Sequence, residues 1–97
     1  MIIWNEPIEF QWDSGNSQKN EKHKVINAEI EEAFNDPNKV MAPDHKHSTV
    51  EQRHILLGKT KKKRLLYIVF TVRKGNVRVI SARDINKKEV DLYEKAT

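Results

Sequence analysis

Arginines recur along the C-terminal half of the chain at spacings that can place several of them on one β-hairpin. Arg73, Arg78 and Arg83 follow one another closely, and Arg53 precedes them. A guanidinium group stays charged, and its planar fork of N–H donors matches the geometry of phosphate. RNA can be cleaved without a metal when the 2′-hydroxyl attacks the adjacent phosphorus, assisted by a general base and by cations that stabilise the added negative charge. These arginines are therefore candidate phosphate ligands, with RNA as the expected substrate.

The distribution of charge supports an anionic partner. Residues 1–48 contain five Lys/Arg and nine Asp/Glu, a net charge of −4, whereas residues 49–97 contain thirteen and five, a net charge of +8. From Arg53 to Arg83 there are ten basic residues and no acidic one. Segregated charge builds a positive surface that suits a polyanion or an acidic protein. The alternative is that each arginine makes an ordinary surface ion pair with a nearby carboxylate of Asp84, Glu89 or Glu94.

Two other polar clusters carry weaker signals. A basic run can hold an RNA backbone through point charges without specifying a sequence. It consists of Lys59, Lys61, Lys62, Lys63 and Arg64. The histidines of residues 44–47, with His54 nearby, lack the i, i+4 spacing of helical zinc sites, and Lys46 between them repels a cation. We therefore expect no metal and no other cofactor.

Alternating apolar and polar residues predict the sheet that must position the arginines. A short strand is expected at residues 8–12 and another at residues 40–41. Three further strands, joined by short turns, are expected at residues 53–59, 65–72 and 77–83. Residues 65–72 are almost wholly apolar, which is typical of a central strand buried on both faces.

The loop between the last two strands decides which side chains share a face. Three side chains lie on one face of the central strand: Tyr67, Thr71 and Arg73. On the returning strand Ser81 and Arg83 share a face, and Arg78 points to the other. A four-residue loop pairs Arg73 with Arg78, whereas a three-residue loop places Arg83 opposite Tyr67. Because a slip of one residue exchanges the faces, the sequence leaves both registers open.

Capping residues predict two helices before the main strands. Asp13 or Ser14 can cap a weak polar helix that continues through residues 17–23. Asn27 is expected to cap a clearer helix. Its apolar residues have helical spacing and are Ile30, Ala33 and Phe34.

A last helix is opened by Asn86 and Glu89 in capping-box spacing, with Val90 and Tyr93 facing inward. The expected architecture is one α+β domain over residues 1–97, in which a small antiparallel sheet carries helices on one face. Its element order is β-α-α-(β)-β-β-β-α.

Composition indicates the cellular compartment in which the protein is expected. The chain has no cysteine, no apolar run long enough to cross a bilayer and no basic start followed by an apolar segment. We therefore expect a cytoplasmic protein without a signal peptide. Apolar side chains near the N-terminus can cover the core or meet a partner protein or a second copy. They are Ile2, Ile3, Trp4 and Trp12.

Short motifs run in order through almost the whole chain. They are residues 10–13, 22–25, 32–37, 47–48 with 51–53, Gly58, 70–73 and 78–83, followed by Glu89 and Tyr93. The most specific part is Thr-x-Arg at residues 71–73 with Arg-x-x-Ser-Ala-Arg at residues 78–83. In this ordered set the chain resembles the BrnT family, toxins of type II toxin–antitoxin systems with a RelE-like ribonuclease fold.

The resemblance implies a metal-independent ribonuclease that arrests translation and is neutralised by a DNA-binding, BrnA-like antitoxin. A homodimer or a toxin–antitoxin hetero-oligomer is compatible with it. On this basis the candidate RNA and transition-state ligands are Arg53, Arg73, Arg78 and Arg83. Glu89 and Tyr93 become candidate supporting or acid–base residues, and His23 becomes a weaker candidate base.

The chain departs from the family at three positions: Lys24 replaces a frequent Gly, Gln11 a common Glu and Phe70 a common Tyr. The loss of a tyrosine hydroxyl at Phe70 puts any role of that hydroxyl in doubt. Two alternatives therefore stay open. One is a non-catalytic basic module that binds nucleic acid or an acidic partner protein, and the other is a structural domain whose basic face has no ligand.

Overall fold

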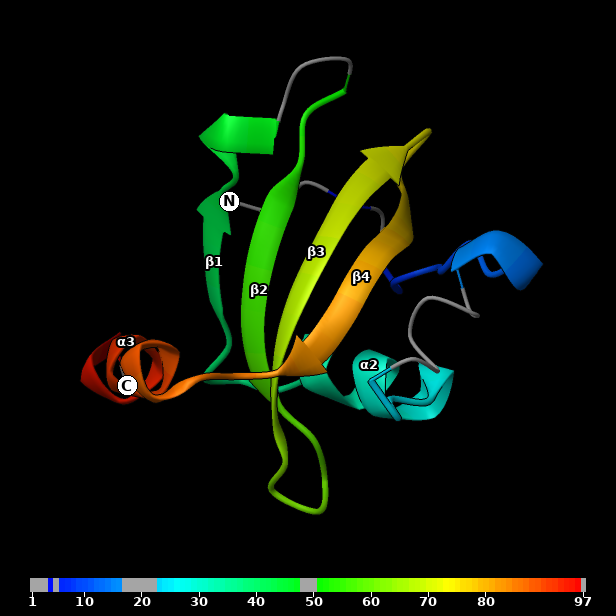
Figure 1. Cartoon of the computed structure of the whole chain (residues 1–97). Helices are drawn as coiled ribbons and strands as arrows, with labels where there is room; N and C mark the ends of the chain where they lie inside the picture. The colour runs from blue at the N-terminus through cyan, green and yellow to red at the C-terminus, as the bar shows by residue number, and fades with distance from the viewer. Residues whose placement is uncertain (1–3, 5, 17–22, 48–50, 97) are drawn as a thin grey trace.

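A four-stranded antiparallel sheet, with its strands in the order β1-β2-β3-β4, forms the centre of the molecule (Figure 1). The computed structural model describes residues 4, 6–16, 23–47 and 51–96. The strands are β1 (Val40–Pro43), β2 (His54–Lys59), β3 (Leu65–Arg73) and β4 (Asn76–Asp84). The helices are α2 (Asn27–Phe34), the 3-10 helix η1 (His45–His47) and α3 (Lys87–Ala96). The predicted α+β class is confirmed.

The core lies between α2 and one face of the sheet. Alternate residues of β3 point into it, and Leu66, Ile68 and Phe70 are fully buried. Phe34 of α2 meets Phe70 edge to face, with ring centroids 5.0 Å apart. Burying such side chains stabilises the fold by roughly 25 cal/mol for each Å² of apolar surface removed from water. This packing leaves the opposite face of the sheet without α2, and we call it the open face.

Gly58 allows the close approach of α2 to the sheet. A Cβ atom at this position would lie 2.5 Å from the backbone oxygen of Ala33 in α2. Any side chain here would push the helix away from β2, because that contact is with backbone and cannot rotate aside. Gly58 is therefore required by packing.

The N-terminal segment covers the core but does not form the predicted strand. Phe10 makes an isolated parallel bridge with Val77, supported by 2.8 Å hydrogen bonds on either side of it. The strand prediction for residues 8–12 is therefore wrong, because pairing stops after one bridge and the chain turns at Asp13. The alternation of apolar and polar residues still places two side chains on one side, since the rings of Phe10 and Trp12 stack with centroids 5.9 Å apart and pack against the core.

The tryptophans also serve the core. Trp4 is buried against Phe34 and Phe70. The Trp12 indole N–H donates to the Glu31 carboxylate over 2.8 Å. Of the predicted roles for the N-terminal apolar residues, covering the core is thus confirmed for both. Ile2 and Ile3 lie outside the described residues.

The helix caps agree with the sequence except at one residue. In α3 the Glu89 N–H donates to the Asn86 side chain and the Asn86 N–H to the Glu89 carboxylate, so the predicted capping box is confirmed. The Asn16 N–H donates to Asp13 Oδ1 at a helical turn of residues 14–16. Most of the helix predicted for residues 17–23 lies outside the described residues.

The N-cap of α2 is Ile26, so the prediction of Asn27 is wrong by one residue. The Ile26 N–H donates to the Glu29 carboxylate over 3.1 Å. Because this bond satisfies the backbone N–H of Ile26, the cap of the helix lies one residue before Asn27. Of the helices in the described part of the chain, none is long and apolar enough to span a membrane.

Candidate functional site

The hairpin of β3 and β4 closes through a loop of two residues, shorter than either predicted length. Lys74 and Gly75 both have positive φ, at 53° and 83°, which is the conformation of a tight two-residue hairpin turn. Arg73 consequently pairs with Asn76, and Thr71 pairs with Arg78.

A β-bulge then changes the register within the same hairpin. Phe70 pairs with Val79, but Val69 pairs with Ser81, so Ile80 has no partner across β3. The extra residue restores the pairing of Tyr67 with Arg83 that a three-residue loop would have given. It also interrupts the alternation of side chains along β4.

The bulge brings the arginines of the hairpin to one face. Cross-strand partners share a face, so Arg78 lies with Thr71 and Arg83 lies with Tyr67. Because Tyr67, Thr71 and Arg73 already share the open face, all three arginines of the hairpin lie there. The prediction that Arg78 points away from Arg83 is wrong, since it assumed an unbroken period of two.

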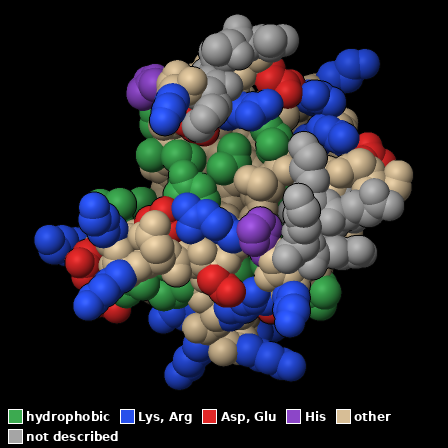
Figure 2. All heavy atoms as spheres, viewed as in Figure 1, with side chains coloured by type: hydrophobic (Ala, Val, Ile, Leu, Met, Phe, Trp, Pro, Cys, Tyr) green, Lys and Arg blue, Asp and Glu red, His purple; other side chains and the backbone are tan. Residues whose placement is uncertain are grey.

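Three arginines and a glutamate surround a hollow of about 310 Å³ on this face. Its lining residues are Gly15, Asn16, Glu51, Arg53, Arg73, Arg78, Val79 and Ile80. We call this the arginine hollow. In space-filling view the same side of the molecule has hydrophobic side chains over the strands, with basic side chains above and below them (Figure 2).

Two arginines of the hollow make ion pairs, as the alternative interpretation expected, but with carboxylates other than the predicted Asp84, Glu89 and Glu94. Arg73 donates to Glu51 through Nε at 3.1 Å and Nη2 at 3.0 Å. Arg78 Nη1 donates to Asp13 Oδ2 at 2.8 Å. These carboxylates are 22 and 65 residues away in the sequence, so the acid-free stretch from Arg53 to Arg83 did not reveal them.

Glu51 is the carboxylate at the centre of this charge cluster. The hydrogen bond from Arg73 lowers the pKa of Glu51, and the charges of Arg73, Arg53 and Arg78 lower it further. The side chain is therefore an anion that several cations share. Our list of candidate residues omitted Glu51, although it belongs to the motif at residues 51–53 that carried the family resemblance.

Arg83 lies farther along the open face and is held by α3. Its Nη1 and Nη2 donate to the two carboxylate oxygens of Glu89 at 2.9 and 2.8 Å. Burial raises the pKa of Glu89, but the hydrogen bonds from Arg83 and Asn86 outweigh it and leave that pKa below its usual value. The Arg83 guanidinium also lies 4.0 Å from the centre of the Tyr67 ring. Glu89 thus positions Arg83.

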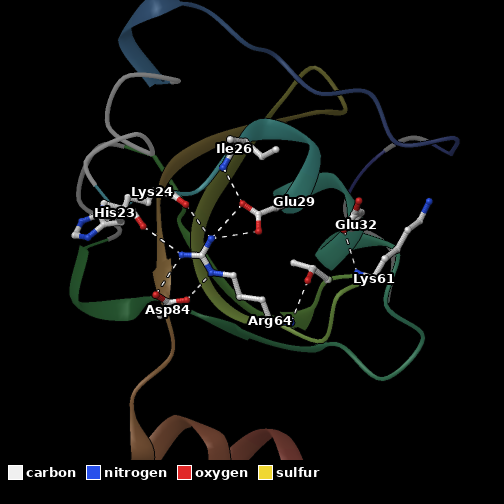
Figure 3. A network of polar contacts seen from close by, with 9 residues as sticks. His23, Lys24, Ile26, Glu29, Glu32, Lys61, Arg64 and Asp84 are labelled. Carbon is white, nitrogen blue, oxygen red and sulfur yellow. Dashed lines mark hydrogen bonds and ion pairs between the residues drawn. The ribbon is translucent and has the colours of Figure 1, made fainter.

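Arg64 belongs to a different site, at the junction of α2 and the end of β4 (Figure 3). Its Nε donates to Asp84 at 2.6 Å, and Nη1 donates to Glu29 and to the Lys24 carbonyl. Nη2 donates to Asp84 and to the His23 carbonyl. These contacts tie three segments together. They do not bring the predicted RNA ligand Arg64 or the predicted base His23 to the arginine hollow.

Tyr93 lies in another buried contact, apart from the hollow. Its hydroxyl donates to Asp36 Oδ2 over 2.5 Å, and the Lys59 ammonium lies 5.6 Å from its ring. Burial, together with the Asp36 carboxylate, raises the pKa of Tyr93 to about 12. Its acid–base role remains a prediction, and its contacts anchor α3. Lys61, Lys62 and Lys63 are exposed on the β2–β3 turn, where their RNA-binding role also remains a prediction.

The chain matches the family model described as the ribonuclease toxin, BrnT, of type II toxin–antitoxin systems, over residues 12–89. The chain belongs to the BrnT family. A search of the curated proteins finds no match. Membership of a type II system implies a protein antitoxin and an RNA target. The matched range contains Asp13, Glu51, Glu89 and every arginine of this chain, whereas Tyr93 lies beyond it.

Two departures from the BrnT pattern now have a structural explanation. Lys24 has a φ of 56°, in the left-handed region that favours glycine, which accounts for a frequent Gly at this position. Phe70 is fully buried on the core face of β3, away from the arginines. A tyrosine hydroxyl at residue 70 would therefore not enter the arginine hollow, and its loss does not alter the site.

No group of three or more His, Asp or Glu side chains in the described parts of the chain is placed to hold a metal ion. The side chain of His47 is not among those described.

Proposed function

We propose that this chain is an endoribonuclease toxin that cleaves RNA in the arginine hollow without a metal. Cleavage would arrest translation, and a BrnA-like antitoxin would neutralise it. The observation that carries the proposal is a single hollow that combines the guanidinium groups of Arg53, Arg73 and Arg78 with the carboxylate of Glu51. These are the two kinds of group that phosphodiester transfer needs, namely cations for the phosphorane and a base for the 2′-hydroxyl.

Substrate binding and activation of the base are linked through Arg73. In the free protein the fork of Arg73 is occupied by Glu51, which keeps the pKa of this carboxylate low and makes it a weak base. A phosphate is an equally good partner for a guanidinium fork. When the phosphodiester takes over this fork, Glu51 loses its strongest hydrogen bond, and its pKa rises toward the usual value.

The chemical step then balances with the residues of the hollow. Glu51 takes the proton of the 2′-hydroxyl as its oxygen bonds to phosphorus. The bond from phosphorus to the 5′ oxygen breaks, and the proton returns, directly or through water, to that leaving oxygen. The products are a 2′,3′-cyclic phosphate and a 5′-hydroxyl. The guanidinium groups stabilise the extra negative charge of the phosphorane that forms on the way to these products.

The test is cleavage of RNA by the purified chain in excess EDTA, with the product ends identified chemically. We expect 2′,3′-cyclic phosphate ends. Glu51→Gln, which keeps the size of the side chain, should slow cleavage by about 100-fold or more. Ile26→Ala, a surface change at the N-cap of α2, is the matched control and should cleave normally. Cleavage that requires a divalent cation, or that survives unchanged in Glu51→Gln, would contradict the proposal.

One observation favours a second candidate, a module that binds RNA without cutting it. Arg73 and Arg78 already have carboxylate partners, so the site can remain closed to chemistry. This alternative predicts binding that weakens steeply with salt and intact RNA after long incubation. The same EDTA experiment separates the two candidates.

A further inference from the structure

An apolar groove adjoins the arginines on the open face. It has a volume of about 550 Å³. Its walls are Val40, Ala42, Ile55, Leu57, Tyr67, Glu89 and Leu92. The hydrophobic side chains over the strands in Figure 2 lie on this side of the molecule. Leu92 of α3 is 60% exposed, although large aliphatic side chains are usually buried. We call this the apolar groove.

The apolar groove also has a few polar groups at its edge, which could stack on a flat ligand or form hydrogen bonds with it. Tyr67 lines it, and its hydroxyl can donate or accept a hydrogen bond. The guanidinium of Arg83 lies 4.0 Å from the centre of the Tyr67 ring, and the Arg83 side chain is 37% exposed, so a ligand can reach it. Glu89 holds Arg83 in this position through two hydrogen bonds.

The groove and the arginine hollow are lined by neighbouring residues of the segment that leads into β2. Arg53 lines the hollow and Ile55 lines the groove, two residues farther along. Side chains two residues apart in extended chain share a face and are about 7 Å apart. Asp44 N–H donates to the Arg53 carbonyl over 2.8 Å, so the extended pairing of β1 with β2 reaches Arg53. A ligand with a phosphate at Arg53 can therefore place a neighbouring group in the groove.

We propose that the apolar groove binds a nucleobase of the same RNA whose phosphate lies in the arginine hollow. This inference rests on the proposed function and adds the site that selects the base. Its volume falls within the range of small-ligand sites, which are mostly apolar with a few polar groups. RNA-binding proteins commonly stack unpaired bases on aromatic rings and guanidinium planes. A protein partner would need about 1,000 Å² of matched surface, far more than one groove provides.

The binding test uses a 2′-fluoro oligonucleotide of mixed sequence, which cannot be cleaved because it lacks the attacking hydroxyl. Its counterpart has the same backbone with abasic residues in place of the bases. We expect the wild-type chain to bind the intact probe about tenfold or more tightly than the abasic one, because a stacked base contributes about that much. Scanning single abasic residues along the probe then identifies the nucleotide that occupies the groove.

Two substitutions test the groove itself. Ala42→Phe fills it, and Tyr67→Leu removes the ring; each should lower the affinity for the intact probe about tenfold and leave the abasic probe unaffected. Leu92→Ala should have a smaller effect in the same direction. Ile26→Ala is its matched control, because Ile26 is also 60% exposed but lies at the N-cap of α2. Thermal unfolding of each variant verifies that it is folded.

Equal affinity for intact and abasic probes would overturn the proposal, as would normal binding by Ala42→Phe. Groove variants that keep RNA binding but are no longer neutralised by a co-expressed antitoxin would show a protein-docking surface instead, and would also overturn it. Failure of the proposed function looks different, because the wild-type chain would then leave RNA intact whatever the probes show. The binding experiment does not depend on cleavage.

Discussion

Arg64 and Arg78, one of the arginines of the hollow, have similar exposure but different partners. The side chain of Arg64 is 26% exposed and that of Arg78 is 22% exposed. Arg64 donates to two carboxylates and two backbone carbonyls, on three separate segments. Among the described residues, Arg78 donates to the carboxylate of Asp13, which is 53% exposed, and Arg73 donates to that of Glu51. Exposure therefore does not distinguish a structural arginine from a functional one in this chain.

The difference lies in whether a phosphate can replace the existing partners. For a phosphate to bind Arg73, it must displace only the Glu51 side chain, which can rotate away. Replacing the partners of Arg64 would separate the 23–24 turn from the end of β4 and take the shared donor from two carboxylates and two carbonyls at once, which costs more than releasing a single ion pair. We therefore assign Arg64 to stability and the arginines of the hollow to RNA.

The largest effect is expected from substitutions in the hollow. Arg73→Ala and Arg78→Ala should each slow RNA cleavage by about 100-fold or more, because each removes a cation that stabilises the transition state. The free energy of unfolding should change by less than about 1 kcal/mol, as is usual for exposed ion pairs. Single-turnover cleavage and urea unfolding measure the two quantities. Normal cleavage by both variants would exclude these arginines from the site.

The opposite pattern is expected at Arg64. Arg64→Ala should lower the free energy of unfolding by about 2–3 kcal/mol, since Glu29, Asp84 and two carbonyls lose their donor. Cleavage per folded molecule should stay close to that of the wild type. Loss of cleavage in a fully folded Arg64→Ala protein would show that the distinction between the two sites is wrong.

Tyr93 should contribute to stability, and this contribution should be lost at high pH. Its pKa is about 12 in the fold and about 10 in the unfolded chain. Its stabilising contribution is therefore complete below pH 10 and is lost as the pH rises to 12, because the unfolded chain releases the proton first. The loss amounts to about 3 kcal/mol. Urea unfolding of wild type and Tyr93→Phe across this range should show the wild type losing more stability, and parallel curves would contradict the assignment.

The smallest effect is expected from Asp13, which competes with RNA for Arg78. Asp13→Asn keeps a good N-cap for the turn at residues 14–16 but removes the charge. Affinity for the 2′-fluoro probe should rise about two- to fivefold, as expected for loss of one exposed ion pair. Weaker binding by Asp13→Asn would indicate that Asp13 positions Arg78 for RNA and does not compete with it.

The main strands were predictable because each follows a simple rule. The apolar segment of β3 and the capping box of α3 are local signals, and the structure has both where the sequence indicates them. The bulge at Ile80 was not predictable, because nothing in the residue types of β4 distinguishes a bulged residue from a paired one. It decides the face on which Arg83 lies, so the grouping of the arginines depended on a feature without a local signal.

The ion pairs of Arg73 and Arg78 were missed for a different reason, whereas the pairing of Arg83 with Glu89 was among the alternatives that the sequence left open. Counting charges between Arg53 and Arg83 describes the chain, whereas Asp13 and Glu51 reach the arginines through the fold. Tyr67 was recognised as a member of the face but not as a site residue, since only the pairing with Arg83 places a guanidinium on its ring. The family motifs contained Glu51 and were the better guide to it.

The most direct test of the central claim is side-chain NMR of the arginine Nε–H groups during titration with the 2′-fluoro oligonucleotide. If the hollow binds the RNA backbone, the signals of Arg73 and Arg78 will shift with the probe concentration, and the signal of Arg64 will stay in place. Shifts at Arg64 with unchanged signals from Arg73 and Arg78 would contradict the account.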